Sequence, residues 1–456
     1  MEAFEYRQGD LYCENVQAMD IATRFGTPTL VYSAHALTTA AKRYHDAFGA
    51  IGVGVMFSVK SCPTIGCLRR IAKAGLGMCA TSGADLERAW LSRAPMTSVM
   101  LAGVAKTDDD IRAALDGIYS PLFQGGVTLD GRPPYYRGPI GWFIAESHGE
   151  IERIARVAKG LRINCRVALR VRLPSLAPPV EGSRGVDSKF GMPAATALDA
   201  FDRYRDLPNV SICGLHTHLG PVATTPERHA EAAKALSELA REAKGSGHSI
   251  ELIDLGGGFA PIGVSGTAPT PERYAEAIEP AVKWAIEEGI GVVVEPGSAI
   301  ATAAATLLVR VLDAKPLEDR VLLITDGGLS SSDANRRADA VRVVWPASVD
   351  PGKEPPREDT ERIDPRGMHW YDVTGPTGWD DDAIAGGRLM PPVDAGGVLA
   401  VFSMGASPQR SLAYDHATSL PAEVIVDGLR PTLLRTKRDM CDRIAAEAVA
   451  LDTSVE

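Results

Sequence analysis

Between residues 51 and 304, short apolar runs rich in β-branched residues alternate with stretches whose apolar residues recur every three or four positions. The runs predict buried strands, and the longer stretches predict amphipathic helices. Eight runs occur, at 55–59, 76–80, 98–102, 142–145, 166–172, 211–217, 250–255 and 292–295. Eight strand-helix units in about 250 residues are typical of a (β/α)8 TIM barrel, so the count favours this α/β fold over a doubly wound sheet.

Two of the predicted helices have well-marked beginnings. The sequence TPE occurs at 225–227 and again at 270–272. In each, threonine suits the N-cap, proline suits the first helical position, and the acid suits the positive end of the helix dipole. We therefore expect helices to begin at residues 226 and 271.

After residue 305 the pattern changes to short β-branched segments separated by Gly, Pro and Asp, which predicts an antiparallel β domain, a barrel or a sandwich. These segments lie at 306–314, 320–326, 340–346, 398–403 and 422–428. The strand-like sequence TPTLVYS at 27–33 precedes the barrel, so the N-terminal segment is expected to complete the β domain. The predicted divisions are 1–50, 51–304 and 305–456, with Gly- and Pro-rich loops at 117–141 and 350–367.

Composition narrows the class of protein. The chain has 456 residues, 45% hydrophobic and 23% charged, which is enough for a sizeable core and excludes disorder for most of it. A formal net charge of −10 disfavours nucleic acid and anionic membranes as partners. No apolar run reaches the roughly 18 residues of a membrane span, and the N-terminus lacks the pattern of a signal peptide. The seven cysteines form no CxxC pair, so we expect a cytoplasmic protein with free thiols and no metal.

Candidate chemistry follows the predicted strands, because function in a barrel collects at the C-terminal ends of its strands. Each candidate also has a plain structural explanation: a solvated lysine, a core histidine, a tight turn or a helix cap. The lysine is surrounded by apolar neighbours, which predicts a buried ammonium with a purpose. Four such residue types at the same end of the barrel are more probable as one site than as four unrelated structural residues. The candidates are Lys60 after the first run, His216 and His218 at the sixth, Gly256, Gly257 and Gly258 after the seventh, and Glu295 at the eighth.

This combination of side chains suggests pyridoxal phosphate as the cofactor. The amine of Lys60 would form a Schiff base with the cofactor aldehyde. Bare backbone N–H groups of the three glycines would hold the phosphate. A carboxylate at Glu295 would pair with the pyridine nitrogen and keep it protonated, which makes the ring a strong electron sink.

With these residues in this order, the chain resembles the fold type III pyridoxal phosphate decarboxylases, the group of diaminopimelate, ornithine and arginine decarboxylases. The resemblance runs from about residue 27 to 428 and rests on the order and spacing of several short motifs. They are FSVKS (57–61), SGADL (82–86), AKTDDDI (105–111), SKFG (188–191), GLHTHLG (214–220), DLGGGF (254–259), EPG (295–297), DGG (326–328), GPT (375–377) and GA (405–406).

The resemblance implies a role for each matching residue. Lys60 is the Schiff-base lysine, His218 stacks on the cofactor ring, and Glu295 binds the pyridine nitrogen. The three glycines cradle the phosphate, Gly297 of EPG belongs to the cofactor site, and Arg170 lies near the cofactor. The family works as a homodimer with its active sites at the interface, where the GPT-type loop reaches into the partner's site.

The chain also departs from the family pattern. Three residues that contact the cofactor phosphate in the family are replaced, by Pro221, Ser298 and Ser407. Ser298 and Ser407 are the expected substitutes at their own positions.

The GPT loop departs as well. The family's cysteine, which returns a proton after carbon dioxide leaves, is here Gly378, and the acid beside it is Trp379. The expected replacement proton donor is Asp380, with the other acids of 380–382, a water molecule or Lys60 as alternatives.

The leading hypothesis is therefore an amino-acid decarboxylase similar to diaminopimelate decarboxylase, acting through the Lys60 Schiff base and a quinonoid intermediate. Arg170 and Arg172 could hold a second carboxylate of the substrate. One alternative is another reaction at Cα in specialised metabolism: decarboxylation coupled to transamination or bond formation, or racemisation, which Glu295 disfavours. The other alternative is a cofactor-binding protein that has lost catalysis.

Overall fold

The computed structural model describes residues 3–117, 138–173, 188–220, 225–261, 268–328, 343–353, 366–378, 382–406 and 420–437. The chain forms two compact units. One comprises Ala40–Ala260 and Pro269–Gly297, and the other comprises Met1–Thr39, Pro261–Ala268 and Ser298–Glu456. The domain boundaries expected from the sequence, after residues 50 and 304, stay a prediction.

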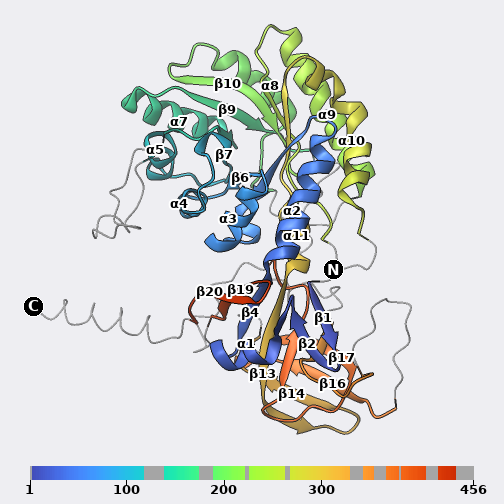
Figure 1. Ribbon diagram of the computed structural model, residues 1–456. Helices are drawn as coiled ribbons and strands as arrows, with labels where there is room; N and C mark the ends of the chain where they lie inside the picture. Colours follow the sequence, from blue (N-terminus) through green and yellow to red (C-terminus); the bar gives the residue numbers. More distant parts are fainter. Residues whose placement is uncertain are drawn as a thin grey trace, which may run out of the picture. The chain divides into compact units, whose positions relative to one another are not determined.

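The first unit is a closed barrel of eight parallel strands, as the sequence predicts (Figure 1). Around the barrel the strand order is β5, β6, β7, β8, β9, β10, β11 and β12. Every one of the eight predicted runs is a strand. Their bounds are β5 (Gly54–Ser58), β6 (Gly77–Ala80), β7 (Val99–Leu101), β8 (Trp142–Ala145), β9 (Cys165–Arg170), β10 (Val210–His216), β11 (Leu252–Asp254) and β12 (Gly291–Val294).

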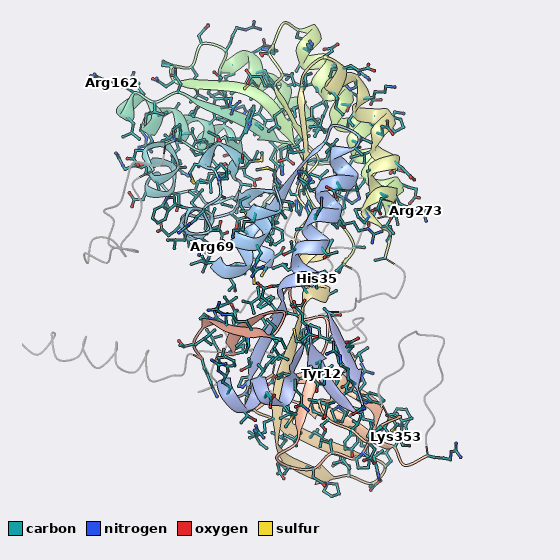
Figure 2. All side chains as sticks on the ribbon, in the orientation of Figure 1. Tyr12, His35, Arg69, Arg162, Arg273 and Lys353 are labelled. Carbon is teal, nitrogen blue, oxygen red and sulfur yellow. The ribbon has the colours of Figure 1, made fainter. Side chains whose placement is uncertain are left out.

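Helices surround this barrel (Figure 1), and they alternate with the strands along the chain. The helices α9 and α10 begin at the predicted residues, since the hydroxyls of Thr225 and Thr270 accept backbone N–H groups of their first turns. Charged side chains such as Arg69, Arg162 and Arg273 are exposed on the outside (Figure 2). The helices are α2 (Ala34–Gly49), α3 (Ile65–Lys73), α4 (Gly83–Leu91), α5 (Asp108–Asp116), α7 (His148–Leu161), α8 (Ala194–Arg203), α9 (Pro226–Gly245) and α10 (Pro271–Glu287).

Side chains that point inward from the strands fill the interior of the barrel. Chemistry in this fold takes place at the C-terminal ends of the strands. Seven buried residues from six strands and their ends pack together in the interior: Met56, Cys79, Met100, Ala102, Ile144, Ala168 and Leu252. Because the core closes the lumen, the polar residues at the strand ends lie on a rim above packed apolar side chains.

The second unit is a mostly antiparallel β structure, and the N-terminal segment contributes to it as predicted. Strand β4 pairs with β13 on one side and with β19 on the other. The sheet is not purely antiparallel, because β4 with β19 and β14 with β16 are parallel pairs. Its strands are β4 (Thr29–Ser33), β13 (Ala305–Pro316), β14 (Val321–Thr325), β15 (Val344–Pro346), β16 (His369–Thr374), β17 (Ala383–Met390), β18 (Val398–Val401), β19 (Ala422–Asp427) and β20 (Arg430–Arg435).

The same unit holds a small N-terminal sheet and helix that the sequence reasoning did not predict. Strands β1 (Phe4–Arg7), β2 (Asp10–Cys13) and β3 (Val16–Gln17) form an antiparallel sheet, followed by α1 (Ala18–Phe25). Leu11 and Ile21 from this segment share a core cluster with Val31 of β4 and Val424 of β19. The N-terminus is therefore part of the β unit's core.

Several sequence predictions concern residues outside the described ranges. Most of the two predicted loops, at 117–141 and 350–367, lies there. Among the described helices, none combines the length and the apolar character that crossing a membrane requires. Six cysteines fall in the described part of the chain, and all six are free and buried.

Candidate active site

The predicted site residues come from four consecutive strands of the barrel, β10, β11, β12 and β5. Lys60 follows β5 in a short 3-10 turn, Val59–Ser61. The expectation that its ammonium is buried is wrong, because this side chain is exposed. Strand β5 ends at Ser58, and in the turn that follows Val59 is buried while Lys60 is exposed. With the residues that the structure describes, Lys60 forms no hydrogen bond or ion pair, so its amine is open to a ligand.

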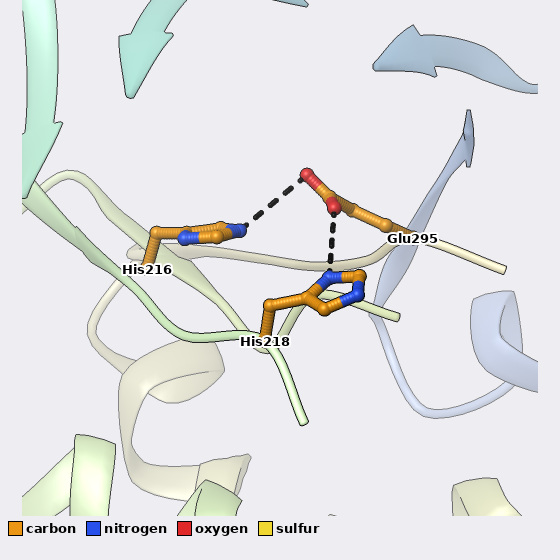
Figure 3. A group of neighbouring side chains, drawn as sticks. All are labelled: His216, His218 and Glu295. Carbon is orange, nitrogen blue, oxygen red and sulfur yellow. Dashed lines mark ion pairs between the residues drawn. The ribbon is translucent and has the colours of Figure 1, made fainter. Parts of the chain in front are cut away.

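His216, the last residue of β10, and His218, two residues further on, face one carboxylate that follows β12 (Figure 3). His216 Nε2 lies 3.7 Å from Glu295 Oε1, and His218 Nδ1 lies 3.7 Å from Glu295 Oε2. The side chains of His216 and Glu295 are 0% and 4% exposed, whereas that of His218 is 16% exposed. The partly open histidine is therefore the one placed to meet a ligand at the rim.

The protonation states of this cluster follow from burial. Burial lowers the pKa of His218 to about 4, and the charges of Lys60 and Arg170 act in the same direction. Burial also lowers the pKa of His216. Burial alone would raise the pKa of Glu295, but the two facing imidazoles outweigh it and hold that pKa well below its usual value. At neutral pH the cluster is one carboxylate anion between two neutral rings.

Two further groups line the same end of the barrel. Asp254, the last residue of β11, is fully buried; burial and then the charge of Glu295 raise its pKa, so its carboxyl is the protonated partner of the pair. Cys79 on β6 is buried as well, and burial followed by the charge of Glu295 raises the pKa of its thiol. Both groups are therefore neutral, and Glu295 carries the negative charge.

The cluster contains buried polar atoms that no other described atom satisfies. Both ring nitrogens of His216 lack a hydrogen-bond partner, and so do Glu295 Oε1 and Asp254 Oδ2. Leaving such groups unpaired in a protein interior costs roughly 1–3 kcal/mol each. Three of these atoms lie together, since His216 Nε2 is 3.7 Å from Glu295 Oε1 and 4.0 Å from Asp254 Oδ2, and unsatisfied groups this close together indicate a binding site.

The glycines after β11 form a tightly constrained loop. Gly256 has φ +66°, and a Cβ there would lie 2.1 Å from the carbonyl oxygen of Thr217. A Cβ on Gly257 would lie 2.8 Å from the carbonyl oxygen of Glu295. The N–H of Gly257 donates to His218 Nδ1 at 3.1 Å. Only glycine fits these two positions, and the loop is tied directly to the ring of His218.

Gly297 is required for a similar reason, because a Cβ there would lie 2.2 Å from the hydroxyl oxygen of Ser61. This close approach brings the segment after β12 against the turn that carries Lys60. The next residue, Ser298, is half-buried and begins the short helix α11 (Ser298–Ala301).

Arg170 at the end of β9 is held by neighbours rather than left open. Its Nη1 donates to Glu146 Oε1 at 2.7 Å, and its guanidinium carbon lies 4.6 Å from the ring centroid of Phe190. The other oxygen of Glu146 accepts the N–H of Gly191 at 2.6 Å. The SKFG motif therefore packs around this ion pair. Sequence reasoning missed Glu146, although it follows β8 directly and a reading of all eight strand ends would have found it.

Some predicted site residues lie outside the described part of the chain: Asp380, Ser407, Pro221 and Trp379. In the β unit, Gly378 is exposed at the end of the described loop. The neighbouring acid, Asp382, is 2% exposed and accepts the N–H of Thr377 at 2.9 Å. Asp382 is therefore a buried acceptor that holds the loop backbone, and a proton donor among the acids at 380–382 stays a prediction.

Two kinds of ligand could use this set of donor groups. His216, His218 and Glu295 offer ligand atoms within 4.8 Å of one another, a His2Glu set of the kind that zinc accepts. Pyridoxal phosphate fits more of the site. Its ring nitrogen suits the unpaired Glu295 oxygen, its phosphate suits backbone N–H groups of a glycine loop, and its aldehyde suits the open amine of Lys60. A metal would leave the glycine loop and the lysine unexplained.

Comparison with known families agrees with this geometry. The model of the family "Pyridoxal-dependent decarboxylase, pyridoxal binding domain" matches residues 35–302, which is more than half of the chain. The matched segment contains the whole barrel and every site residue that the structure places on its rim.

Relatives that match nearly the whole chain are named diaminopimelate decarboxylase. Diaminopimelate decarboxylase of Zymomonas mobilis is 29% identical over 98% of this chain and 99% of its own length. The Haemophilus influenzae protein of the same name is 28% identical, covering 98% of this chain and 100% of its own length. Among solved structures, diaminopimelate decarboxylase of M. jannaschii in complex with L-lysine aligns over 97% of both chains with a TM-score of 0.81 at 22% identity, which supports the fold.

Proposed function

We propose that the substrate of this protein is an amino acid of the diaminopimelate kind. The chain belongs to the pyridoxal-dependent decarboxylase family, and it is a pyridoxal phosphate-dependent carboxy-lyase. The substrate assignment draws support from relatives named diaminopimelate decarboxylase that cover nearly the whole chain. The observation that carries the site is the buried carboxylate of Glu295, which lies between two neutral imidazoles and whose Oε1 has no hydrogen-bond partner among the described residues, beside a glycine loop and an exposed lysine.

Each rim residue has a defined task in this proposal. When bound, pyridoxal phosphate withdraws electrons from the bond between Cα and the carboxylate of the attached amino acid. The carboxylate of Glu295 would accept a hydrogen bond from the protonated ring nitrogen and so would keep the ring positively charged. A neutral imidazole at His218 can lie against that ring without charge repulsion, because its pKa of about 4 keeps it unprotonated. Lys60 would supply the amine that holds the cofactor aldehyde.

Arg170 is proposed to shape the rim rather than to bind a second substrate carboxylate. Glu146 already accepts a hydrogen bond from Arg170 Nη1 at 2.7 Å. The side chains of Arg170 and Glu146 are 12% and 5% exposed. Such an ion pair offers little net positive charge to a second anion. A residue other than Arg170 or Glu146 must therefore recognise the far end of the substrate.

A second outcome of the same chemistry is favoured by the loop of residues 375–378. Gly378 has no side chain to deliver a proton, and Asp382 is engaged with the backbone of Thr377. With no donor for Cα on this loop, the pyridoxal phosphate that the site would hold would offer another carbon for the proton, and the amino acid would then give carbon dioxide and a carbonyl compound. Decarboxylation would be retained, but the product would be an aldehyde or ketone in place of an amine.

The test is product analysis with the cofactor-loaded full-length protein. Meso-diaminopimelate, L-lysine, L-ornithine and L-arginine are each incubated with it, and carbon dioxide, amine and carbonyl products are measured by mass spectrometry. We expect carbon dioxide from diaminopimelate; lysine as the other product supports ordinary reprotonation, and a carbonyl product supports the second outcome. Lys60→Ala serves as the inactive control. Absence of carbon dioxide from all four amino acids contradicts the proposal.

Assembly and location belong to the same proposal. Resemblance to the family supports a homodimer in which the loop at 375–378 reaches the partner's site. Sedimentation analysis at two protein concentrations tests this, and a monomer at both would contradict it. The acidic composition and the free, buried cysteines support a cytoplasmic location.

A further inference from the structure

The glycine loop is backed by aromatic side chains that neither the sequence reasoning nor the family resemblance assigns a role. Phe259, directly after the three glycines, is 3% exposed. Its ring lies 4.4 Å from that of His229 on α9 and 4.9 Å from that of Tyr274 on α10, measured between centroids. Tyr44 of α2 packs edge-on against it at 5.9 Å. The end of the loop is therefore clamped by three helices.

One of these side chains also reaches the backbone at the end of the loop. The hydroxyl of Tyr274 accepts the N–H of Ala260 at 3.3 Å. His229 contacts the loop through its ring, which packs on Phe259, while its Nδ1 lies 3.2 Å from the carbonyl oxygen of Thr225. Burial lowers the pKa of His229 to about 4, so the ring is neutral at pH 7. His229 thus links the N-cap of α9 to the residue that follows the three glycines.

These contacts matter more here than they would in a chain with a full set of phosphate ligands. Pro221, Ser298 and Ser407 stand where the resembled family has larger or better hydrogen-bonding side chains on the phosphate. Phosphate binding must then depend more on the backbone of the loop, where the N–H of Gly256 already donates to Asp254 Oδ1 at 2.8 Å and that of Gly257 to His218 Nδ1 at 3.1 Å. A backbone anion site works only if its N–H groups point at one place, so the elements that fix the loop set its affinity.

We propose that His229 and Tyr274 are positioning residues that hold the Gly256–Gly258 loop in the shape that receives the cofactor phosphate. The proposal rests on pyridoxal phosphate as the cofactor, and it extends the site from the rim to a second layer formed by α9 and α10. Neither side chain touches the cofactor, because Tyr274 acts through the backbone of Ala260 and His229 acts through the ring of Phe259.

The test separates the phosphate from the rest of the cofactor. Dissociation constants for pyridoxal phosphate and for pyridoxal, which lacks the phosphate, are measured by absorbance and fluorescence on the cofactor-free full-length protein. The ratio of the two constants reports phosphate binding alone. In Tyr274→Phe and His229→Phe, which keep the aromatic packing, we expect this ratio to change about fivefold, entirely through weaker pyridoxal phosphate binding.

Tyr44→Phe is the matched control. Its ring packs on the same Phe259 and is 2% exposed, but its hydroxyl forms no hydrogen bond with the described residues. We expect its ratio to equal that of the wild type. The proposal is overturned if Tyr274→Phe and His229→Phe weaken both ligands equally, leave both unchanged, or change the ratio no more than Tyr44→Phe does. If the wild type binds neither pyridoxal phosphate nor pyridoxal, the cofactor assignment itself fails. That result differs from one in which the wild type binds both and the variants leave the ratio of the two dissociation constants unchanged.

Discussion

Two lysines follow strands at the same end of the barrel and have opposite surroundings. Lys106 comes after β7 and its side chain is 1% exposed. It donates to the carbonyl oxygens of Gly103 and Ile144 at 2.6 Å each, and to Glu150 Oε2 at 3.1 Å. Lys60 after β5 is exposed and has no such partner among the described residues.

The difference shows which property marks a reactive amine. An ammonium has three protons to donate, and Lys106 uses all of them within the protein. Burial lowers the pKa of Lys106, but Glu150 acts in the opposite direction and keeps it paired. Sequence reasoning selected Lys60 partly because a buried ammonium needs a purpose. The buried ammonium is in fact the structural one, and the unpartnered amine is the one free for chemistry.

The largest effect is expected from removing the open amine. Lys60→Ala should lower decarboxylation by at least about a thousandfold, because no other group on the rim can hold the aldehyde carbon. Carbon dioxide release measures the rate. Borohydride reduction followed by peptide mass spectrometry should find the cofactor adduct on residue 60 in the wild type and nowhere in the variant. An adduct on Lys106 instead would reverse the comparison.

Removing the buried amine should act on stability instead. Lys106→Met leaves Glu150 and two carbonyl oxygens without their donor, so the free energy of unfolding should fall by about 3–5 kcal/mol. Lys60→Met, at an exposed position, should change it by less than about 0.5 kcal/mol. Urea denaturation of the two variants measures both values. Equal losses would mean that burial and partnering do not distinguish the two lysines.

A smaller effect is expected at the carboxylate that faces the ring nitrogen. Glu295→Gln removes the charge but keeps the size, and it should slow decarboxylation by about 10- to 100-fold, the value of one charge-assisted hydrogen bond. Glu288→Gln changes an exposed carboxylate on the outer surface and should leave the rate within about twofold. If Glu295→Gln matched that control, the carboxylate would have no part in the reaction.

The smallest effect concerns pH. The pKa of His229 is lowered from 6.5 to about 4 by burial, so the unfolded chain takes up a proton first on acidification. The stabilisation from the neutral ring is full above pH 6.5 and is lost as the pH falls toward 4. Between pH 7 and 5 this amounts to about 2 kcal/mol. Urea denaturation of the cofactor-free protein should therefore show a steeper acid loss in the wild type than in His229→Phe, and parallel curves would contradict it.

Local patterns in the sequence were enough for the barrel and for most of its rim. The first predicted run, 55–59, differs from β5 by one residue at each end, and the helices capped by Thr225 and Thr270 begin as expected. Alternating strands and helices close in only a few ways, so eight units place their strand ends on one rim. That is why the positions of Lys60, His218 and Glu295 after their predicted strands were enough to group them in one site.

Strands β16 and β17 were missed because their partners are distant and their patterns are interrupted. Strand β17 contains Gly386 and Gly387, which weaken a strand pattern, and β16 pairs in parallel with β14 across some fifty residues. The burial of Asp382 has the same origin. The carboxylate of Asp382 lies against Gly328 and Gly375, which are 47 residues apart in sequence. The local sequence therefore predicts an ordinary acid in a loop, and only the fold buries it.

By itself the sequence determined the fold class, the residue types on the rim and the cofactor that suits them, because periodicity and strand-end position are local properties. Only the tertiary structure decided which of these groups have spare bonding capacity. It paired Arg170 with Glu146 and engaged Asp382, and it left Glu295 and Lys60 with capacity to bind a ligand. Hydrogen bonds and burial depend on side chains that come together from distant parts of the chain, and no local pattern records those meetings.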